Sequence, residues 1–346
     1  MDMPKKGEKK SYENVEGQEK AAGIVCNINE MTPEERRQLA YKLMEKQGDK
    51  EFLISFCESD LHNFYEDCEK NPRHEKFYPV DQFSITLLPR KYQTMELYHV
   101  IKSLGFLTVR VEVRSATPKD CESSLNKPIT YGTGRIYDVK KYVGDDKVCP
   151  CADCKAGTPV SEWLNIKAMT AKHIVPDNID ASHTFLKLVN GSHKSENYIL
   201  DGISAQVSSC HDWCRLTCIT HDTSLFNKVD EELKAYNMYA RRLYEFYRHS
   251  RGKEKFVVII SCPHGCSKQI SFGYWCQREQ TGGIDTAYTY TAPTCVGSSG
   301  ASVFILGRDG RQGLFNQIHS GCRSRKDKKN NFIDGEKVNF STCVPE

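Results

Sequence analysis

The sequence predicts a mostly β fold with a helical segment at its N-terminal end. From residue 106 onward, short apolar stretches recur between turn residues, and several alternate with a period of two, as residues 107–114 (LTVRVEVR) do. Many short strands at such spacing are typical of a sandwich or of barrels. One amphipathic helix, expected over residues 230–248, interrupts the strands and divides them into two halves. We therefore expect residues 106–346 to form the β domain.

Two further parts precede the β domain. Residues 1–20 are polar and charged without periodicity, so a disordered tail is expected there. Residues 21–105 are expected to form a helical N-terminal segment, with later helices over residues 52–69 and 93–104. Their apolar stripes are most simply packing faces, although they could also bind a protein partner.

The first helix of this segment has clear start and stop signals. Thr32 is a helix N-cap, Pro33 suits the first helical position, and Glu35 completes a capping box. Gly48 is expected to end the helix.

The bulk properties exclude several classes of protein. The 346 residues suffice for one large domain with an appendage, or for two to three small ones. A net charge of +3 is too weak to indicate nucleic-acid binding, and no apolar run is long enough to span a membrane. The charged N-terminus is followed by no apolar segment, unlike a secretory signal, so a cytoplasmic location is expected.

The stretch TCVGSSGASVFILG (residues 294–307) is the most informative in the chain. Gly297 and Gly300 bracket Ser298 and Ser299, and an apolar strand follows. Glycine permits the tight turn that exposes a serine hydroxyl and aims backbone N–H groups at a developing oxyanion. An ordinary Gly/Ser loop is the simpler alternative.

A serine nucleophile needs a base and a carboxylate that orients it. His173 lies at the end of a predicted strand, in the run MTAKHIV, and Asp212 opens an alternating strand. Asp222 is the rival carboxylate, but it follows that strand instead of opening it. Taken alone, His173 is more simply a core or surface histidine.

Together these runs resemble the motifs of trypsin/chymotrypsin-like serine proteases, the S1 family of the PA clan. TAKHIV around His173 resembles their Thr-Ala-Ala-His-Cys, and GSSGA (residues 297–301) resembles Gly-Asp-Ser-Gly-Gly. Asp212 and the strand after it resemble Asp-Ile-Ala-Leu-Leu. The chain order His, Asp, Ser is that of chymotrypsin, whereas unrelated folds use other orders.

The resemblance implies two antiparallel six-stranded β-barrels and a role for each residue. Ser299 would be the nucleophile, His173 the general base and then acid, and Asp212 the group that fixes the imidazole tautomer. The N–H groups of Gly297 and Ser299 would form the oxyanion hole, and no cofactor would be needed. Ser298 occupies the position where the family usually has Asp or Asn, which makes it the weaker candidate nucleophile.

The chain departs from the family in two places. The only run like the Ile-Val-Gly-Gly start is GIVC (residues 23–26), far upstream, so activation by a newly freed N-terminus is not supported. Ala301 and Ser302 replace a glycine and a proline after the nucleophile. They resemble the Gly-Asn-Ser-Gly-Ser-Pro-Val-Phe version of bacterial glutamyl endopeptidases.

That likeness suggests a substrate preference. The run IHSG (residues 318–321) resembles the strand that walls the S1 pocket of glutamyl endopeptidases, and His319 matches the histidine that binds the substrate carboxylate. Thr294 matches a threonine that assists it. Imidazole and hydroxyl donors can pair a buried acidic side chain, so cleavage after Glu or Asp is expected. The alternative is that His319 only packs or hydrogen-bonds in the second barrel.

Sixteen cysteines offer candidate metal ligands. Without a signal peptide they are more simply free thiols, buried small hydrophobes or ligands than disulfide partners. Cys149, Cys151 and Cys154 are close enough in sequence to bind a structural zinc with a fourth ligand from elsewhere. Further thiols gather at Cys210, Cys214 and Cys218 and at Cys262 and Cys266.

The predicted function is that of a cytoplasmic serine endopeptidase acting on proteins or peptides, with no nucleic-acid or membrane partner. The first rival is a protease-fold binding protein, inactive or self-inhibited, with the N-terminal helices as its interaction element. The second rival is a zinc-stabilised adaptor.

Overall fold

The computed structural model describes residues 30–114, 127–144, 147–157, 159–189, 197–282, 285–308, 316–326 and 332–344. Its helices are α1 (Pro33–Met44), α2 (Leu61–Glu66), α3 (Met95–Leu107), α4 (Ala152–Ala156), α5 (Asn178–Ala181) and α6 (Leu225–Tyr247). Short 3-10 turns occur at Glu45–Gln47, Glu58–Asp60, Pro72–His74, Val80–Gln82, Ile85–Leu87, Arg90–Tyr92 and Pro263–Gly265. The tail expected over residues 1–20 lies outside the described residues.

The strands fall into two sets. The first set is β1 (Leu53–Ser55), β3 (Thr108–Arg114), β4 (Ile129–Val143), β5 (Glu162–Thr170), β6 (Thr184–Val189), β7 (Asn197–Val207) and β8 (Cys214–Thr220). The second set is β2 (Phe77–Pro79), β9 (Phe256–Ser261), β10 (Gln269–Gly282), β11 (Asp285–Tyr290), β12 (Ser302–Ile305), β13 (Asn316–Lys326) and β14 (Phe332–Val344).

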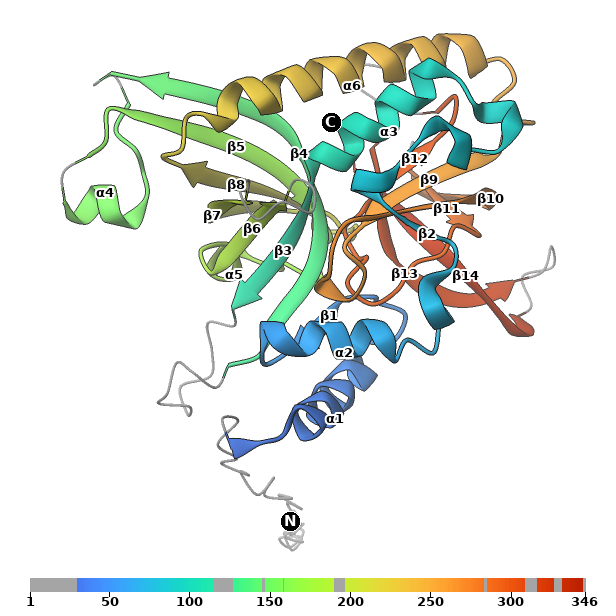
Figure 1. The fold of residues 1–346 in the computed structure, drawn as a ribbon, viewed down its shortest axis with the longest axis horizontal. Coiled ribbons are helices and arrows are strands. Elements are labelled where there is room, and N and C mark those ends of the chain that lie inside the picture. Colours follow the sequence, from blue (N-terminus) through green and yellow to red (C-terminus); the bar gives the residue numbers. More distant parts are fainter. Residues whose placement is uncertain are drawn as a thin grey trace, which may run out of the picture.

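Each set closes into an antiparallel barrel. The first sheet runs in the order β1-β4-β3-β6-β7-β8-β5, and a further β4–β5 pairing closes all of it except β1. The second runs in the order β11-β14-β13-β12-β9-β10-β2, and a β10–β11 pairing closes all of it except β2. The predicted pair of six-stranded barrels with a helical N-terminal segment is thus confirmed, and the barrels lie side by side in Figure 1.

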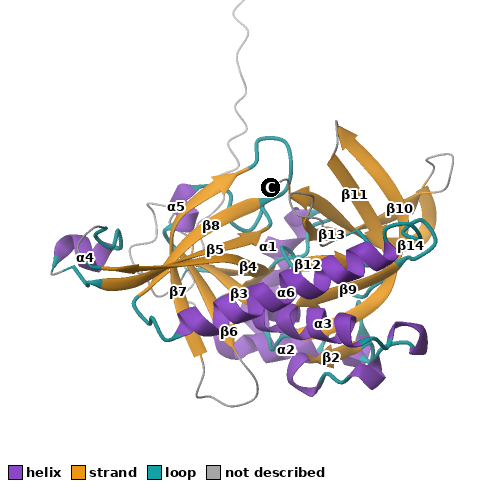
Figure 2. Ribbon diagram, turned by 90° about the horizontal axis from the view of Figure 1, so that it is seen from above, coloured by secondary structure: helices purple, strands orange, loops and turns teal. Residues whose placement is uncertain are grey.

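Two helices run together across the barrels. In Figures 1 and 2, α3 and α6 lie side by side and cover one face of the molecule. Their buried side chains belong to one apolar core with residues of both barrels, including Val111 and Phe304. The helix expected over residues 230–248 begins five residues earlier, at Leu225.

The N-terminal segment contains both expected and unexpected elements. α1 has the predicted capping box, with Thr32 accepting from the Glu35 N–H while the Glu35 carboxylate accepts from the Thr32 N–H. The helix expected over residues 52–69 is wrong in its first half, because Leu53–Ser55 form β1 and pair with β4. Only Leu61–Glu66 are α-helical there. β2 pairs with β10 of the second sheet. The N-terminal segment therefore contributes one strand to each sheet, β1 to the first and β2 to the second.

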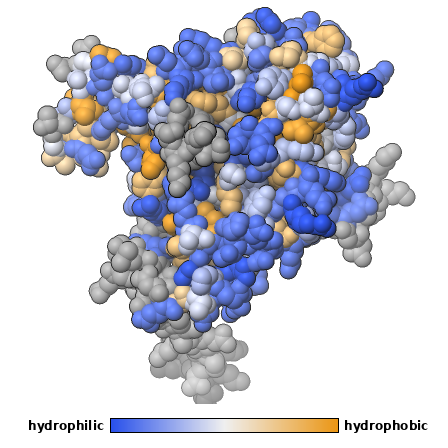
Figure 3. Space-filling view, viewed as in Figure 1, coloured by the Kyte–Doolittle hydropathy of each residue, from blue (hydrophilic) through white to orange (hydrophobic). Residues whose placement is uncertain are grey.

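The surface agrees with the modest net charge. Figure 3 shows polar side chains over most of one face, with apolar residues scattered among them. Among the described helices, none combines the length and the hydropathy that crossing a bilayer requires.

We expect the N-terminal segment to unfold together with the barrels. Leu53 is fully buried in a cluster with Leu61 and with Tyr131 of β4. In a Ser299→Ala background, Leu53→Ala should lower the free energy of unfolding by about 3 kcal/mol in a single urea transition. The exposed neighbour Leu43→Ala is the control and should change it by less than about 0.5 kcal/mol. Two separate urea transitions would contradict a core shared by the N-terminal segment and the first barrel. Equal effects of Leu53→Ala and Leu43→Ala on the free energy of unfolding would contradict it as well.

Candidate active site

A glycine-bounded loop between β11 and β12 carries Ser299. Gly297 has φ of 90° and Gly300 has φ of 86°, the left-handed region that favours glycine. A Cβ on Gly300 would lie 2.1 Å from the Thr133 carbonyl oxygen, so no other residue fits there without a shift. This geometry turns the N–H groups of Gly297 and Ser299 toward one point.

The opposite barrel fixes this loop through Thr133 of β4. The Thr133 N–H donates to the Ser299 carbonyl at 2.8 Å, and its hydroxyl donates to the Gly297 carbonyl at 2.8 Å. The same hydroxyl accepts from the Cys262 N–H of the second barrel at 2.9 Å. The loop position is therefore set by both barrels.

His173 and Asp212 meet at the junction from the side of the first barrel. His173 follows β5 and Asp212 precedes β8. The Asp212 carboxylate lies 2.8 Å from Nδ1 of His173 and also accepts from the His173 backbone N–H at 3.1 Å. Burial would raise the pKa of Asp212, but the hydrogen bond and charge of His173, and then Lys50, hold it well below its ordinary value. Asp212 is thus an anion placed to hold the imidazole with its proton on Nδ1.

The three predicted triad residues therefore converge, but one contact between them is not formed. His173 Nε2 is buried without a hydrogen-bond partner among the described residues. Ser299 Oγ instead accepts from the backbone N–H of Glu51 at 3.1 Å. Asp222, the rival carboxylate, binds Ser224 instead. Ser298, the rival nucleophile, donates to Ser261 at 3.1 Å.

The predicted oxyanion hole holds a carbonyl of the same chain. The N–H groups of Gly297 and Ser299 donate to the Glu51 carbonyl oxygen at 2.7 and 3.2 Å. Two residues earlier, the Asp49 carbonyl accepts from the Cys322 N–H at 2.8 Å, and Lys50 forms an antiparallel bridge with Gly321 of β13. The chain thus enters the site as an extended strand.

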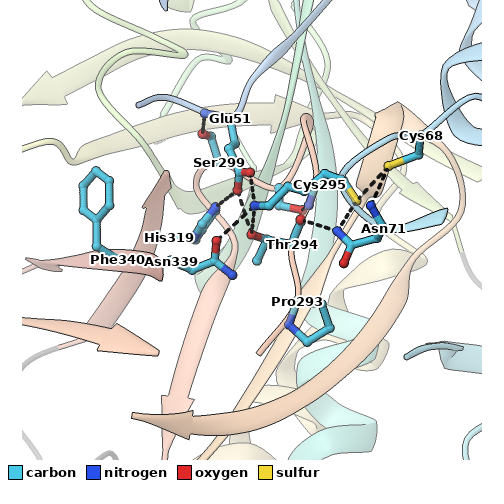
Figure 4. Close-up of polar contacts among 12 residues, drawn as sticks. Glu51, Cys68, Asn71, Pro293, Thr294, Cys295, Ser299, His319, Asn339 and Phe340 are labelled. Atoms are coloured by element: carbon cyan, nitrogen blue, oxygen red, sulfur yellow. Dashed lines mark hydrogen bonds and ion pairs between the residues drawn. The ribbon is translucent and has the colours of Figure 1, made fainter. Parts of the chain in front are cut away.

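The Glu51 side chain occupies the subsite that the sequence assigned to an acidic substrate residue. Its carboxylate accepts from His319 Nε2 at 2.6 Å and from Thr294 Oγ1 at 2.7 Å. Lys70 Nζ binds the other carboxylate oxygen. Figure 4 shows Glu51 beside Ser299, His319 and Thr294, with Asn339 close by. We call Thr294, His319 and Lys70 the acid subsite.

The proton positions in the acid subsite follow from its buried neighbours. Tyr290 Oη lies 2.6 Å from Nδ1 of His319, and burial raises the pKa of Tyr290 well above its ordinary value. Tyr290 therefore keeps its proton, which faces both Nδ1 of His319 and the Phe340 carbonyl. The ionised Glu51 carboxylate can only accept, so Nε2 of His319 carries the proton that it donates to Glu51. Burial also lowers the pKa of His319, which favours this neutral tautomer.

The positive charge in the acid subsite comes from Lys70. Burial opposes ionisation of Glu51, but Lys70 and then His319 lower its pKa to about 2. The pKa of Lys70 is raised despite its own desolvation, because Glu51 is its partner. The subsite thus pairs an anionic carboxylate with an ammonium ion and two neutral donors.

Sequence reasoning missed two residues of the site. Lys70 and Glu51 lie in the segment that was expected to be helical, and neither stands in a recognisable motif. The acid expected in the subsite was a substrate's, and no local pattern could show that the chain itself supplies one.

A separate cluster surrounds the expected zinc ligands. Nε2 of His221, just after β8, lies 3.3 Å from the Cys149 sulfur and 3.6 Å from those of Cys151 and Cys154. His221 is therefore a candidate for the fourth ligand that the sequence left open. Cys214 and Cys218 are instead buried in β8.

The class of fold can now be stated. Two closed six-stranded antiparallel barrels, with histidine and aspartate from one and serine from the other, have the architecture of trypsin-like serine proteases. No family model matches the sequence, and no significant relative is found among curated proteins.

Among solved structures, the chain is similar to the active form of the Rv3671c protease from M. tuberculosis. The identity is 13%, the match covers 71% of this chain and 79% of that one, and the TM-score is 0.36. It is also similar to Deg5, at 11% identity, with 75% and 91% covered and a TM-score of 0.37. Similarity at this level carries no argument about activity, which has to be inferred from this chain's own residues.

The buried Glu51 carboxylate should make stability depend on pH. The pKa of Glu51 is lower in the folded chain than the ordinary 4.5. Its ionised form therefore contributes fully to the free energy of unfolding above about pH 4.5, and this contribution is lost as the pH falls toward about 2. In a Ser299→Ala background, Glu51→Gln should lower the free energy of unfolding at pH 7. We expect the difference between the two proteins to shrink over that window.

The measurement is urea unfolding at a series of pH values. The exposed Glu45→Gln is the matched control, because it changes the same group without a buried partner. A difference between the Glu51→Gln protein and its parent that stays constant from pH 7 to pH 2 would contradict an ionised, paired Glu51.

Proposed function

We propose that this protein is a serine endopeptidase that uses His173, Asp212 and Ser299. Three observations support the assignment: the short contact between His173 and Asp212, the glycine-bounded turn under Ser299, and the paired N–H groups of the oxyanion hole. The last carries the most weight, because the two donors hold a peptide carbonyl of the kind that the reaction would polarise.

The mechanism follows from these positions. His173 Nε2 would take the proton of Ser299 Oγ as the oxygen attacks the substrate carbonyl carbon. Asp212 would stabilise the imidazolium, and the N–H groups of Gly297 and Ser299 would stabilise the oxyanion. His173 then gives its proton to the leaving amine, and water hydrolyses the acyl-enzyme by the same steps. No cofactor takes part in this scheme.

We further propose a preference for Glu, and then Asp, at P1, the residue before the cleaved bond. The supporting observation is Glu51, whose carbonyl lies in the oxyanion hole while its carboxylate binds the acid subsite. Lys70 would supply the charge that distinguishes Glu from Gln, and His319 and Thr294 would supply hydrogen bonds.

The second candidate function is a protease-fold binding protein that does not cleave. It is favoured by the occupied site and by His173 Nε2, which has no hydrogen-bond partner in the part of the chain that the structure describes. A bound structural zinc at Cys149, Cys151, Cys154 and His221 is compatible with either function, and we propose it for the stability of that loop.

The experiment is hydrolysis of peptides that differ only at P1, by the full chain carrying Glu51→Ala so that the acid subsite is free. We expect Glu to be preferred over Asp, and Asp over Gln, Lys and Phe. Adding Ser299→Ala should reduce kcat/KM more than about 10³-fold and abolish labelling by a fluorophosphonate. Lys70→Met should lower the preference for Glu over Gln roughly tenfold, because a charged hydrogen bond is lost.

Two outcomes would contradict the proposal. A folded Glu51→Ala protein with no Ser299-dependent hydrolysis or labelling would support the binding protein instead. Serine-dependent hydrolysis without preference for an acidic P1 residue would keep the peptidase but overturn the role of the acid subsite.

A further inference from the structure

We infer that residues 49–52 are an internal substrate and that the protein cleaves its own chain between Glu51 and Phe52. This inference rests on the proposed function, because it uses the same nucleophile and the same acid subsite. It goes beyond that function in three ways. It names the bond that is cleaved, it explains why the site is closed before cleavage, and it predicts a new N-terminus at Phe52.

Three successive residues are held as a protease holds a substrate. The Asp49 carbonyl and Lys50 pair antiparallel with β13, and the Glu51 carbonyl lies between the N–H groups of Gly297 and Ser299. The Glu51 side chain fills the acid subsite. A chance contact of a surface loop would not engage backbone and side chain at each of these points.

This segment also closes the site. Ser299 is fully buried, and Glu51 is 5% exposed. Lys50 Nζ binds Asp212 at 2.6 Å, and the Phe52 ring lies 5.5 Å from that of His173. An external peptide therefore has to displace the segment before it can reach the nucleophile.

The reaction balances without any added reactant except water. Ser299 Oγ releases the Glu51 N–H, gives its proton to His173 and forms a bond to the Glu51 carbonyl carbon. The C–N bond to Phe52 breaks, and His173 protonates the new amine. Water then hydrolyses the ester, which leaves a Glu51 carboxylate, a free amine on Phe52 and a regenerated serine.

The chain that follows the Glu51–Phe52 bond is held by β1, which pairs with β4 of the first barrel. Leu53 is fully buried and pairs with Tyr131 of β4, so the part beginning at Phe52 stays on the first barrel after cleavage. Lys70 also lies on this side and remains in the acid subsite. Cleavage would therefore sever the covering segment from β1 without dismantling the acid subsite.

The test is incubation of the purified full chain, followed by intact mass measurement and N-terminal sequencing. We expect a fragment that begins at Phe52, forming at a rate independent of protein concentration because donor and acceptor share one chain. Ser299→Ala and Glu51→Ala should not yield it. The exposed Glu45→Ala is the matched control and should behave as wild type.

The outcomes separate this inference from the proposed function. An intact wild-type chain, alongside a Glu51→Ala variant that hydrolyses Glu peptides, would overturn self-cleavage and leave the peptidase standing. Cleavage at another bond would overturn it as well. Absence of Ser299-dependent hydrolysis in both proteins would overturn the proposed function itself.

A different observation carries a second inference. We infer that Cys68, His74, His264 and Cys295 bind a zinc ion. All four residues are buried, and their ligand atoms lie within 4.8 Å of one another. Two come from the N-terminal segment and two from the second barrel, so the ion would join these parts. Figure 4 shows Cys68 and Cys295 facing each other.

The spacing of the ligand atoms fits a tetrahedron around zinc. Bonds of about 2.3 Å to sulfur and about 2.05 Å to nitrogen place two sulfurs about 3.8 Å apart, two nitrogens about 3.3 Å apart, and a mixed pair about 3.6 Å apart. The Cys68 and Cys295 sulfurs are 3.6 Å apart, and the Nε2 atoms of His74 and His264 are 3.2 Å apart. The Cys295 sulfur lies 3.5 Å from His74 Nε2.

The surroundings favour ligands over ordinary core packing. His74 and His264 have φ of 51° and 55°, a region that costs a residue with a Cβ about 1–2 kcal/mol. Tyr65 stacks on the His74 ring with centroids 3.9 Å apart and fixes its orientation. Asn71 donates its backbone N–H to the Cys68 sulfur and its side-chain amide to the Cys295 sulfur, as donors around bound thiolates do.

Such an ion would lie next to the acid subsite. Cys295 directly follows Thr294, and Cys68 lies two residues before Lys70. Binding of the four ligands would therefore hold both donors to the substrate carboxylate in place.

The test is elemental analysis of the full chain purified with zinc in the medium, in a Ser299→Ala background. We expect two zinc ions per chain. His74→Asn should remove one, and His221→Asn, the matched control at the Cys149 cluster, should remove the other. Cobalt in the His221→Asn protein should give the intense visible absorption of a tetrahedral site with thiolate ligands.

Zinc that is abolished by His221→Asn but unaffected by His74→Asn would overturn this second inference. An intact mass lower by two hydrogen atoms, from a disulfide between Cys68 and Cys295, would overturn it too. If the His74→Asn protein does not fold, the cobalt spectrum of the His221→Asn protein still tests this site. Absence of the tetrahedral thiolate absorption there would overturn the second inference.

Discussion

The hydrogen bonds of one threonine join the two barrels at the candidate nucleophile. Thr133 belongs to the first barrel, yet its N–H and hydroxyl bind the carbonyls of Ser299 and Gly297 in the second. Its own carbonyl accepts from Thr170, near the end of the strand that leads to His173. The histidine–aspartate pair and the serine therefore share one frame, because hydrogen bonds of Thr133 connect the loop of Ser299 to the strand that leads to His173.

Charge balance at Glu51 is the second constraint. A buried carboxylate is costly unless it is paired and hydrogen-bonded, and here Lys70, His319 and Thr294 meet that need. The donors that hold Glu51 in the site are therefore the same ones that would select an acidic substrate residue.

Much of the barrel region could be predicted because its signals are local. The alternating run at residues 107–114 forms β3, which spans Thr108–Arg114. The helix expected over residues 52–69 failed in its first half, because Leu53 pairs with a strand far away in sequence. An apolar stripe says which residues are buried, but it does not say what covers them.

Some residues of the candidate site could be predicted from local sequence motifs, and others could not. Ser299, His173 and Asp212 stand in motifs and could be found, whereas Lys70, Glu51 and His221 stand in none. They are recruited by tertiary contacts, which no pattern within a short window records.

The N-terminal segment has a consequence for how this chain can be divided. By sequence, a boundary falls near residue 106, where helices give way to strands. By contact, the described part of this segment belongs with the barrels. β1 and β2 extend the two sheets and Lys70 belongs to the acid subsite, while Met44 of α1 is buried beside Leu53 of β1. A fragment that starts at residue 106 would keep His173, Asp212 and Ser299 and still lack Lys70 of the acid subsite. The smallest portable unit of this protein therefore begins no later than α1.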